Sequence, residues 1–567
     1  MRLHHAVIAL LVLSPACSQE PAAPPPAQPV QKVALKDLPN INTELALADI
    51  KKLSSDEFEG RAPGSKGEEL TVQYLTEQFK AAGLEPGNPD GTWTQAVPLV
   101  SLQPTSISPL TVTGKNGKSR SFRIRDEFVP FSRRVEDKVS LDKSSLVFVG
   151  YGVQAPEYQW DDFAGIDVKG KTIVVLVNDP QVTEPNSKNL DPKMFNGNAM
   201  TYYGRWTYKF DHAAELGAAG VIIVHDTPTA GYPFTVVQGM GGERFNLVTP
   251  NKNADKAAVE SWISTDGARE MFKLAGLDFD AEKTKAAMRG FKPVDLNLTA
   301  TVNFTQKMRT LNSRNVIAKL TGSDPTLKNE YVVFSAHWDH FGIGEPVKGD
   351  NIYNGAQDNA SGTAGLLAIA RAAKQVQPAP KRTLLFLAVT AEEQGLLGSG
   401  YYGEFPLYPL NKTLANINID DNLSLIGRTS DTIVVGLGAS DLDDYLREAA
   451  GELGKTLKPD AEPEKGFYYR SDHFNFAKVG VPALNAGNGD DVIGKPAGYG
   501  RQKKDEYTAS IYHSPQDQFM TDWDMAGYAE DAKVLFAVGY RVAQADKFPE
   551  WKPGNEFKAI REKSLIK

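Results

Sequence analysis

A short apolar run, Val332-Val333-Phe334, leads directly into the polar sequence His337-Trp338-Asp339-His340. Such a run predicts a buried strand that delivers polar groups at its carboxyl end. A glycine-containing loop follows, and residues 357–362 then lead into the apolar stretch 366–373, which predicts a helix. Asp358 is therefore expected where a loop enters a helix. In open α/β sheets the ligand site lies at this edge.

Strand and helix patterns alternate over the rest of the region 306–548. Apolar strand patterns occur in the segments NVIAKLTG, RTLLFLAVTAEE, LANINID, TIVVGL and VPALNA. Residues 525–546 predict the final helix of the region. This alternation predicts an α/β fold with a mixed, largely parallel sheet flanked by helices.

The N-terminal half predicts two further parts. Helical spacing begins at Leu45, a second helix is expected over residues 68–82, and residues 92–130 resemble short strands. Residues 145–300 are β-rich and resemble an inserted protease-associated domain. The resembling segments are Phe148–Gly152, Val168–Lys171 and Ala213–Ile223. The two histidines in this part, His212 and His225, are expected to be structural.

These patterns divide the chain into six expected parts. Residues 1–17 are expected to be a signal peptide, 18–44 a Pro/Ala-rich tether and 45–140 the N-terminal part of the main α/β domain. The inserted domain is expected over 141–305, the rest of the main α/β domain over 306–548 and a C-terminal tail over 549–567.

The first 17 residues have the pattern of an export signal. Arg2 precedes a short apolar run, and Ser14-Pro15-Ala16 leads to Cys17, the single cysteine of the chain. The position of Cys17 resembles the lipidated cysteine of a bacterial lipoprotein, although Leu13 is one place further from it than usual. We therefore expect an exported protein, periplasmic or on the cell surface. Lipidated Cys17 would attach it to a membrane, and plain secretion is the alternative.

Composition narrows the choice of partners and metals. The chain has 567 residues and a formal net charge of −8, without a basic stripe, so no nucleic-acid partner is expected. A single cysteine excludes a disulfide within the chain and a zinc site built on several thiolates. Any zinc site must use imidazole and carboxylate ligands.

Five such ligand candidates stand at strand ends or in adjoining loops: His337, Asp358, Glu393, Asp420 and His513. Each has an ordinary alternative explanation. Asp358 could cap a helix, Glu392-Glu393 could form a solvated turn, Asp421 could replace Asp420, and His513 could lie on the surface. Their coincidence at one sheet edge favours a metal site instead. Two histidines and three carboxylates suit two zinc ions bridged by one carboxylate.

At this point the sequence resembles the co-catalytic di-zinc exopeptidases, a family that includes secreted bacterial aminopeptidases, glutamate carboxypeptidase, glutaminyl cyclase and the transferrin receptor. The motifs that carry the resemblance are residues 337–340, 355–362, 391–395, 418–420, 470–473 and 512–514. Gln357 and Asp421 depart from the family pattern, because an acidic and an apolar residue respectively are common there.

The resemblance implies a role for each residue. His337 and Asp420 would hold one zinc, Glu393 and His513 the other, and Asp358 would bridge them. Asp339 would orient the His337 ring. Glu392 would be the general base.

Tyr512 and Arg470 would stabilise the oxyanion formed during hydrolysis. His340 and His473 are expected to support the site or to be structural.

The resemblance predicts a metallo-aminopeptidase acting on peptides. A glutamate-releasing carboxypeptidase or a dipeptidase remains an alternative, for which Arg470 is the obvious cationic group. A glutaminyl cyclase usually works with one zinc, and a non-catalytic peptide-binding protein would be expected to have lost ligands or the base. The complete set of five ligands and Glu392 argues against both.

Overall fold

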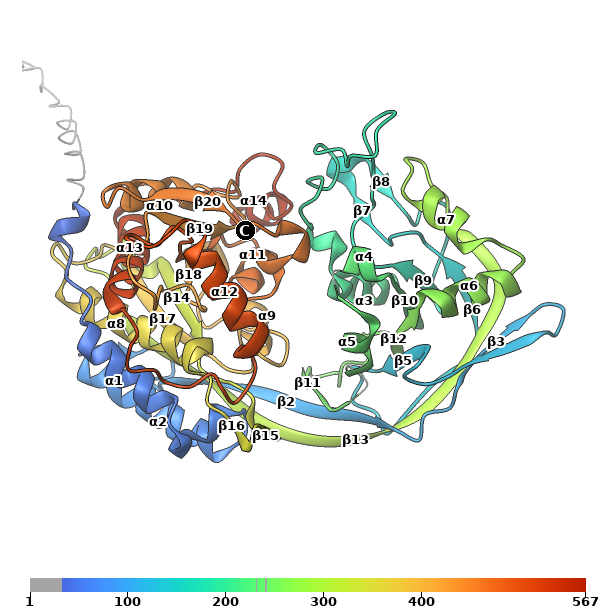
Figure 1. Ribbon diagram of the computed structural model, residues 1–567, viewed down its shortest axis with the longest axis horizontal. Helices are drawn as coiled ribbons and strands as arrows, with labels where there is room; N and C mark the ends of the chain where they lie inside the picture. The colour runs from blue at the N-terminus through green and yellow to red at the C-terminus, as the bar shows by residue number, and fades with distance from the viewer. Residues whose placement is uncertain (1–32, 231, 240–241, 567) are drawn as a thin grey trace, which may run out of the picture. The chain divides into compact units, whose positions relative to one another are not determined.

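The computed structural model describes residues 33–230, 232–239 and 242–566 (Figure 1). The expected signal peptide, Cys17 and the first part of the tether lie outside the described residues. In the described ranges, no helix is both long and apolar enough to span a membrane.

The central sheet of the peptidase part has four neighbouring parallel strands in the order β17-β14-β18-β21. Their bounds are β14 (Tyr331–His337), β17 (Thr383–Val389), β18 (Thr413–Asn418) and β21 (Ala483–Asn488). Antiparallel strands extend the sheet on both sides. β13 (Val294–Leu320) pairs with β17, and β1 (Glu85–Pro86) pairs with β13. β19 (Asp431–Val435) pairs with β21, and β20 (Thr456–Pro459) runs parallel to β19. The expected mixed, largely parallel sheet is confirmed.

Helices cover this sheet (Figure 1). They are α1 (Thr43–Leu53), α2 (Lys66–Ala81), α8 (Gly362–Gln375), α9 (Leu397–Glu404), α10 (Leu442–Gly451), α11 (His473–Lys478), α12 (Tyr499–Ser510), α13 (Met525–Gln544) and α14 (Lys558–Leu565). α8 and α13 pack together with β14 in the main hydrophobic core. A Cβ at Gly539 would lie 2.2 Å from Cζ of Phe334, so glycine permits the close approach of α13 to the sheet.

The inserted part is built on a second sheet region in which β6, β9, β10 and β12 run parallel. Its strands are β3 (Leu110–Gly114), β4 (Ser119–Phe122), β5 (Phe128–Phe131), β6 (Lys138–Phe148), β9 (Thr172–Leu176), β10 (Gly220–His225), β11 (Arg244–Leu247) and β12 (Val259–Ser264), with a small hairpin of β7 (Gln154–Ala155) and β8 (Trp160–Asp161). Its helices are α3 (Trp206–Glu215), α4 (Thr227–Ala230), α5 (Phe234–Gly239), α6 (Thr265–Leu274) and α7 (Phe279–Ala286). Two separate hydrophobic clusters form its core.

One long strand connects the two parts. β13 has 27 residues. Its first half pairs with β3 and β6 of the insertion, and its last residues pair with β17 of the peptidase sheet. In between it pairs with β2 (Thr94–Thr105), so the chain enters and leaves the insertion through a two-stranded antiparallel ribbon (Figure 1).

The structure differs from the expected domain boundaries in three places. Leu110, Phe122 and Phe128 pack in the core of the insertion, which therefore begins well before residue 141. The expected tether ends earlier, because Leu35 and Leu38 are buried in the main core. The expected C-terminal tail is folded as well: it contains α14, and its Trp551 and Phe557 are buried.

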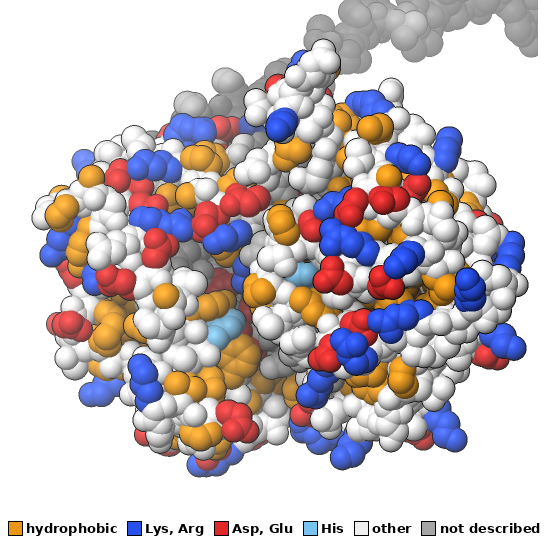
Figure 2. Space-filling view, turned by 45° about the vertical axis from the view of Figure 1, so that its right-hand side comes forward, with side chains coloured by type: hydrophobic (Ala, Val, Ile, Leu, Met, Phe, Trp, Pro, Cys, Tyr) orange, Lys and Arg blue, Asp and Glu red, His pale blue; other side chains and the backbone are white. Residues whose placement is uncertain are grey.

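The face of the molecule in Figure 2 carries acidic and basic side chains interspersed, with hydrophobic side chains scattered between them. Neither acidic nor basic side chains dominate this face. Such a mixed surface is typical of globular proteins.

Candidate metal centre

The five candidate ligands come from strand ends and loops that the sheet brings together. His337 is the last residue of β14, Glu393 follows β17 and Asp420 follows β18, so all three lie beyond the carboxyl ends of neighbouring parallel strands. Asp358 lies just before α8, and His513 lies in the loop after α12. The sequence prediction that these residues share one sheet edge agrees with the structure.

Asp358 lies between the two histidines. Its Oδ1 is 3.3 Å from Nε2 of His337, and its Oδ2 is 3.1 Å from Nε2 of His513. His337 Nε2 is also 3.1 Å from Oδ1 of Asp420, and His513 Nε2 is 3.2 Å from Oε2 of Glu393. Two groups of imidazole and carboxylate atoms therefore share one carboxylate, Asp358.

These residues fit a metal centre. Ligand atoms of His337, Asp358 and Asp420 lie within 4.8 Å of one another. His513 Nε2 is buried close to two carboxylates, yet it forms no hydrogen bond among the described residues. A ring nitrogen that faces carboxylates without hydrogen-bond geometry suits a shared cation. Imidazole and carboxylate are ligands of zinc.

The charges of the site also favour a cation. Burial opposes protonation of His337, but the negative charges of Asp420 and Glu392 raise its pKa well above the ordinary value. Burial likewise opposes the charged form of His513, but the nearby carboxylates of Asp358 and Glu393 raise its pKa to about 9. The carboxylates thus attract positive charge, and metal ions would replace the histidine protons.

The Asp339 carboxylate contacts the segment that contains Glu392, the candidate general base, more directly than it contacts the His337 ring. Its Oδ1 accepts a 3.1 Å hydrogen bond from the backbone N–H of Glu392. His337 Nδ1 lies 3.1 Å from the backbone oxygen of Asp339 and 3.8 Å from its carboxylate. Burial raises the pKa of Asp339 to about 7. The expected contact with the ring is thus made mainly by the backbone of Asp339.

Asp420 and its neighbour Asp421 point to different partners. Asp420 accepts a hydrogen bond from the hydroxyl of Ser471, which itself accepts one from Asn418 at 2.7 Å. Asp421 accepts a 2.7 Å hydrogen bond from Gln357 instead. The two residues that depart from the family pattern thus bind each other, and Asp420 keeps its place beside His337.

Glu392 is positioned differently from Glu393. The carboxylate of Glu393 faces two histidines, with Oε1 2.6 Å from His340 Nδ1 and Oε2 3.2 Å from His513 Nε2. No hydrogen bond to the Glu392 carboxylate is present among the described residues, and burial raises its pKa well above the ordinary value. A partly buried carboxylate that attracts protons beside the ligands suits a general base.

Tyr512 and Arg470 lie around the ligands without joining them. The Tyr512 ring stacks on His513 with centroids 3.6 Å apart. Burial raises the pKa of its hydroxyl far above the ordinary value, so Tyr512 is a neutral hydrogen-bond donor. Arg470 is exposed, lies 5.0 Å over the Phe467 ring, and forms no ion pair among the described residues.

Sequence reasoning missed three supporting residues. Arg61 is buried, and its guanidinium donates hydrogen bonds to the backbone oxygens of Leu53, Trp338, Asn354 and Gly355. Asp517 accepts hydrogen bonds from the backbone N–H groups of Gln357 and Asp358 at 2.9 and 3.0 Å. His340, which the sequence analysis expected to support the site or to be structural, contacts Glu393 directly.

The third missed residue is Arg205 of the insertion. Burial, followed by the charge of Arg470, lowers its pKa to about 10, and its Nε has no hydrogen-bond partner among the described residues. Only Arg61 left a local signal, as the one cation in the loop sequence Glu59–Ser65.

Residues 315–537 match the peptidase family M28, and this range contains all five candidate ligands and Glu392. A probable zinc metalloprotease of Pyrenophora teres f. teres (strain 0-1) is 32% identical over 142 residues, which are 24% of this chain and 28% of that protein. Aminopeptidase YwaD of Bacillus subtilis (strain 168) is 26% identical over 275 residues, which are 47% of this chain and 53% of that protein.

Among solved structures, an aminopeptidase from Aneurinibacillus sp. strain AM-1 is similar with a TM-score of 0.47 and 20% identity. The match covers 89% of this chain and 94% of that one. The chain spans 28% and 53% of the length of the two curated relatives named above.

Proposed function

We propose that this protein is a zinc-dependent aminopeptidase. The proposal starts from the match of residues 315–537 to peptidase family M28. The observation that carries the proposal is the placement of Asp358 between His337 and His513, with Asp420 and Glu393 on either side. This arrangement suits two zinc ions with Asp358 as the shared ligand. The substrates are peptides with a free N-terminus.

The proposed reaction is hydrolysis of the N-terminal peptide bond. Zinc, when bound, lowers the pKa of water and polarises the peptide carbonyl. Glu392 takes the water proton on a carboxylate oxygen and delivers it to the leaving amine nitrogen. The hydrogen bond from the backbone N–H of Glu392 to Asp339 holds the backbone of the segment that carries the Glu392 carboxylate. Tyr512 donates its hydroxyl proton in a hydrogen bond to the developing oxyanion.

A dipeptidase or carboxypeptidase is the second candidate, and the two arginines favour it. Arg470 and Arg205 carry no carboxylate partner among the described residues, and the charge of Arg470 acts on both Arg205 and Tyr512. Arginine binds carboxylates through a planar fork of donors. In this candidate the pair would bind the C-terminal carboxylate of a short peptide.

We also propose that the protein is exported and attached to a membrane through lipidated Cys17. The proposal rests on the sequence of residues 1–17. Cys17→Ser is expected to move the protein from the membrane fraction to the soluble fraction. Mature protein that begins elsewhere and carries no lipid would contradict it.

The experiment for the enzymatic proposal is a substrate panel assayed with and without a chelator. Aminoacyl chromogenic substrates with a free amino group should be hydrolysed, their N-acetylated forms should not, and zinc should restore activity after chelation. Hydrolysis of N-blocked peptides that have a free C-terminus, without aminoacyl hydrolysis, would favour a carboxypeptidase, and hydrolysis of free dipeptides alone would favour a dipeptidase. Full activity in metal-free protein would contradict both.

A further inference from the structure

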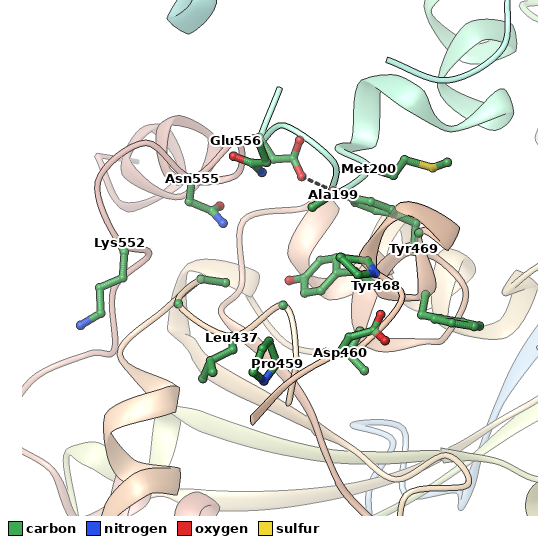
Figure 3. A pocket seen from close by; sticks show the side chains of 18 of the residues that line it. Ala199, Met200, Leu437, Pro459, Asp460, Tyr468, Tyr469, Lys552, Asn555 and Glu556 are labelled. Atoms are coloured by element: carbon green, nitrogen blue, oxygen red, sulfur yellow. Dashed lines mark hydrogen bonds between the residues drawn. The ribbon is translucent and has the colours of Figure 1, made fainter. Parts of the chain in front are cut away.

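A pocket lies between the insertion and the edge of the peptidase sheet (Figure 3). Its volume is about 520 Å³, which is in the range of small-molecule sites. The insertion contributes Asn196, Ala199 and Met200, and the rest of the wall follows the carboxyl ends of β19 and β20 and the segment 552–557.

This pocket is separate from the metal centre. None of the residues that line it is a candidate ligand, Glu392 or Tyr512. β19 runs antiparallel to β21, so the chain after Val435 leads away from the sheet edge that carries His337 and Asp420.

The polar side chains that line the pocket include two carboxylates, Glu556 and Asp460, and one cation, Lys552. Glu556 accepts hydrogen bonds from the Tyr469 hydroxyl at 2.8 Å and from the backbone N–H of Tyr202 at 3.1 Å. Burial raises the pKa of Glu556 to about 7. Asp460 is a second lining carboxylate, whose Oδ1 accepts a hydrogen bond from the backbone N–H of Glu462.

One buried hydroxyl in this pocket has no partner. Tyr468 Oη forms no hydrogen bond among the described residues. Figure 3 shows it directed into the open space between Glu556 and Leu437. A buried hydroxyl without a partner costs free energy that a ligand would recover.

The single lining cation is already neutralised. Lys552 binds Oδ1 of Asp441 at 2.5 Å and Oδ2 of Asp444 at 2.8 Å, and its ammonium points away from Tyr468 in Figure 3. Asp460 and Glu556 therefore dominate the charge of the pocket. Leu437, Pro459 and Met200 supply apolar wall against which an alkyl chain can pack.

We propose that this pocket binds an organic cation, namely the guanidinium or ammonium group of a basic side chain or of a free alkylamine. The charged group binds between Glu556 and Asp460 and donates a hydrogen bond to Tyr468 Oη. The alkyl stem packs on Leu437 and Pro459. Since the insertion forms part of the wall, an occupied pocket links the insertion to the peptidase part.

The test is titration calorimetry with the full chain, which needs no hydrolysis and is therefore independent of the proposed enzymatic function. Agmatine represents the free cation, and N-acetyl-Ala-Arg-amide represents a peptide side chain. The corresponding citrulline peptide has the same shape without the charge. We expect both cations to bind and the citrulline peptide not to bind, and the tighter cation identifies the source.

Variants locate the binding. Glu556→Gln keeps the shape of the side chain and Tyr468→Phe removes one hydroxyl, and each should weaken binding at least about tenfold. Glu393→Ala at the metal centre should bind the cations as the unchanged protein does. Circular dichroism confirms that each variant is folded.

Three results would overturn the proposal. The first is absence of cation binding at millimolar concentration, and the second is equal binding of the citrulline peptide. The third is binding that Glu393→Ala abolishes while folded Glu556→Gln and Tyr468→Phe retain it, which would place the cation at the metal centre.

Discussion

The backbone N–H of Glu392 donates a 3.1 Å hydrogen bond to Oδ1 of Asp339. Asp339 follows β14 and Glu392 follows β17, so this bond ties together the ends of two neighbouring strands. It fixes the segment that carries the candidate base relative to the segment that carries His337. Asp339 therefore positions Glu392, while its own backbone oxygen contacts the His337 ring.

This relationship predicts the effect of Asp339→Ala. The variant leaves the buried N–H of Glu392 without an acceptor, which costs about 1–3 kcal/mol or moves the segment. We expect kcat to fall while zinc content stays close to that of the unchanged protein, because the backbone oxygen of Asp339 still holds His337. Zinc content by mass spectrometry and kcat on one substrate check this.

Asp339→Asn is the matched control, since its amide oxygen can still accept the hydrogen bond, and it should retain more activity than Asp339→Ala. A loss of zinc affinity of about 10–100-fold, with unchanged kcat per bound zinc, would instead show that the Asp339 carboxylate orients the His337 ring.

Arg61→Lys tests the connection between the N-terminal segment and the metal-site loops. Lysine cannot reproduce the fork that donates to the four backbone oxygens. We expect the free energy of unfolding to fall by at least about 2 kcal/mol, together with weaker zinc binding. Denaturant unfolding measures the first and zinc titration the second.

Arg123→Lys is the control, because that side chain is 67% exposed and its ion pairs lie on the surface. Equal stability of the two variants would show that the Arg61 hydrogen bonds contribute little.

The placement of three candidate ligands could be predicted because strand ends are local features of the sequence. Each apolar run ends visibly before His337, Glu393 or Asp420, and the carboxyl ends of parallel strands meet at one edge. The supporting contacts could not be predicted in this way. Arg61 binds Trp338 across 277 residues of sequence, and no local pattern indicates that pairing.

The domain boundaries were less visible for a similar reason. β13 is one continuous strand that belongs to both parts of the sheet, so its sequence gives no break where the insertion ends. Leu35 and Leu38 follow a Pro/Ala-rich stretch, and only their burial against the main core shows that the fold begins there.

His473 predicts a pH dependence of stability. Burial lowers its pKa from 6.5 to about 3, and neither ring nitrogen has a hydrogen-bond partner among the described residues. The unfolded chain therefore binds the proton first as the pH falls. The stability associated with neutral His473 is complete above about pH 6.5 and declines towards the folded pKa of about 3.

His473→Phe should remove this part of the decline. Between about pH 6.5 and 4.5, the difference in the free energy of unfolding between the two proteins should change by up to about 1.4 kcal/mol per pH unit. Denaturant unfolding of both proteins in metal-free buffer at about pH 7.5, 5.5 and 4.5 measures this change. Parallel pH profiles would show that His473 is hydrogen-bonded or solvated in the folded protein.

The last prediction separates Glu392 from Glu393, which are adjacent and chemically identical. Glu393 faces His340 and His513 through its two oxygens, so Glu393→Ala should lower both zinc affinity and turnover. The Glu392 carboxylate lies within 4.8 Å of ligand atoms of His337 and Glu393. It forms no hydrogen bond or ion pair among the described residues, so Glu392→Gln should keep zinc and the fold. Its kcat should fall about 10²–10⁴-fold, the usual contribution of a general base, with little change in KM.

Zinc content and kcat measured side by side for the two variants decide between the roles. Loss of zinc in Glu392→Gln and retention in Glu393→Ala would reverse them. A change of less than about tenfold in kcat for Glu392→Gln would leave the proposed mechanism without its base, because general base catalysis contributes more than that. The proton would then have to be carried by another group beside the ligands, and Asp339, whose pKa burial raises to about 7, is a candidate.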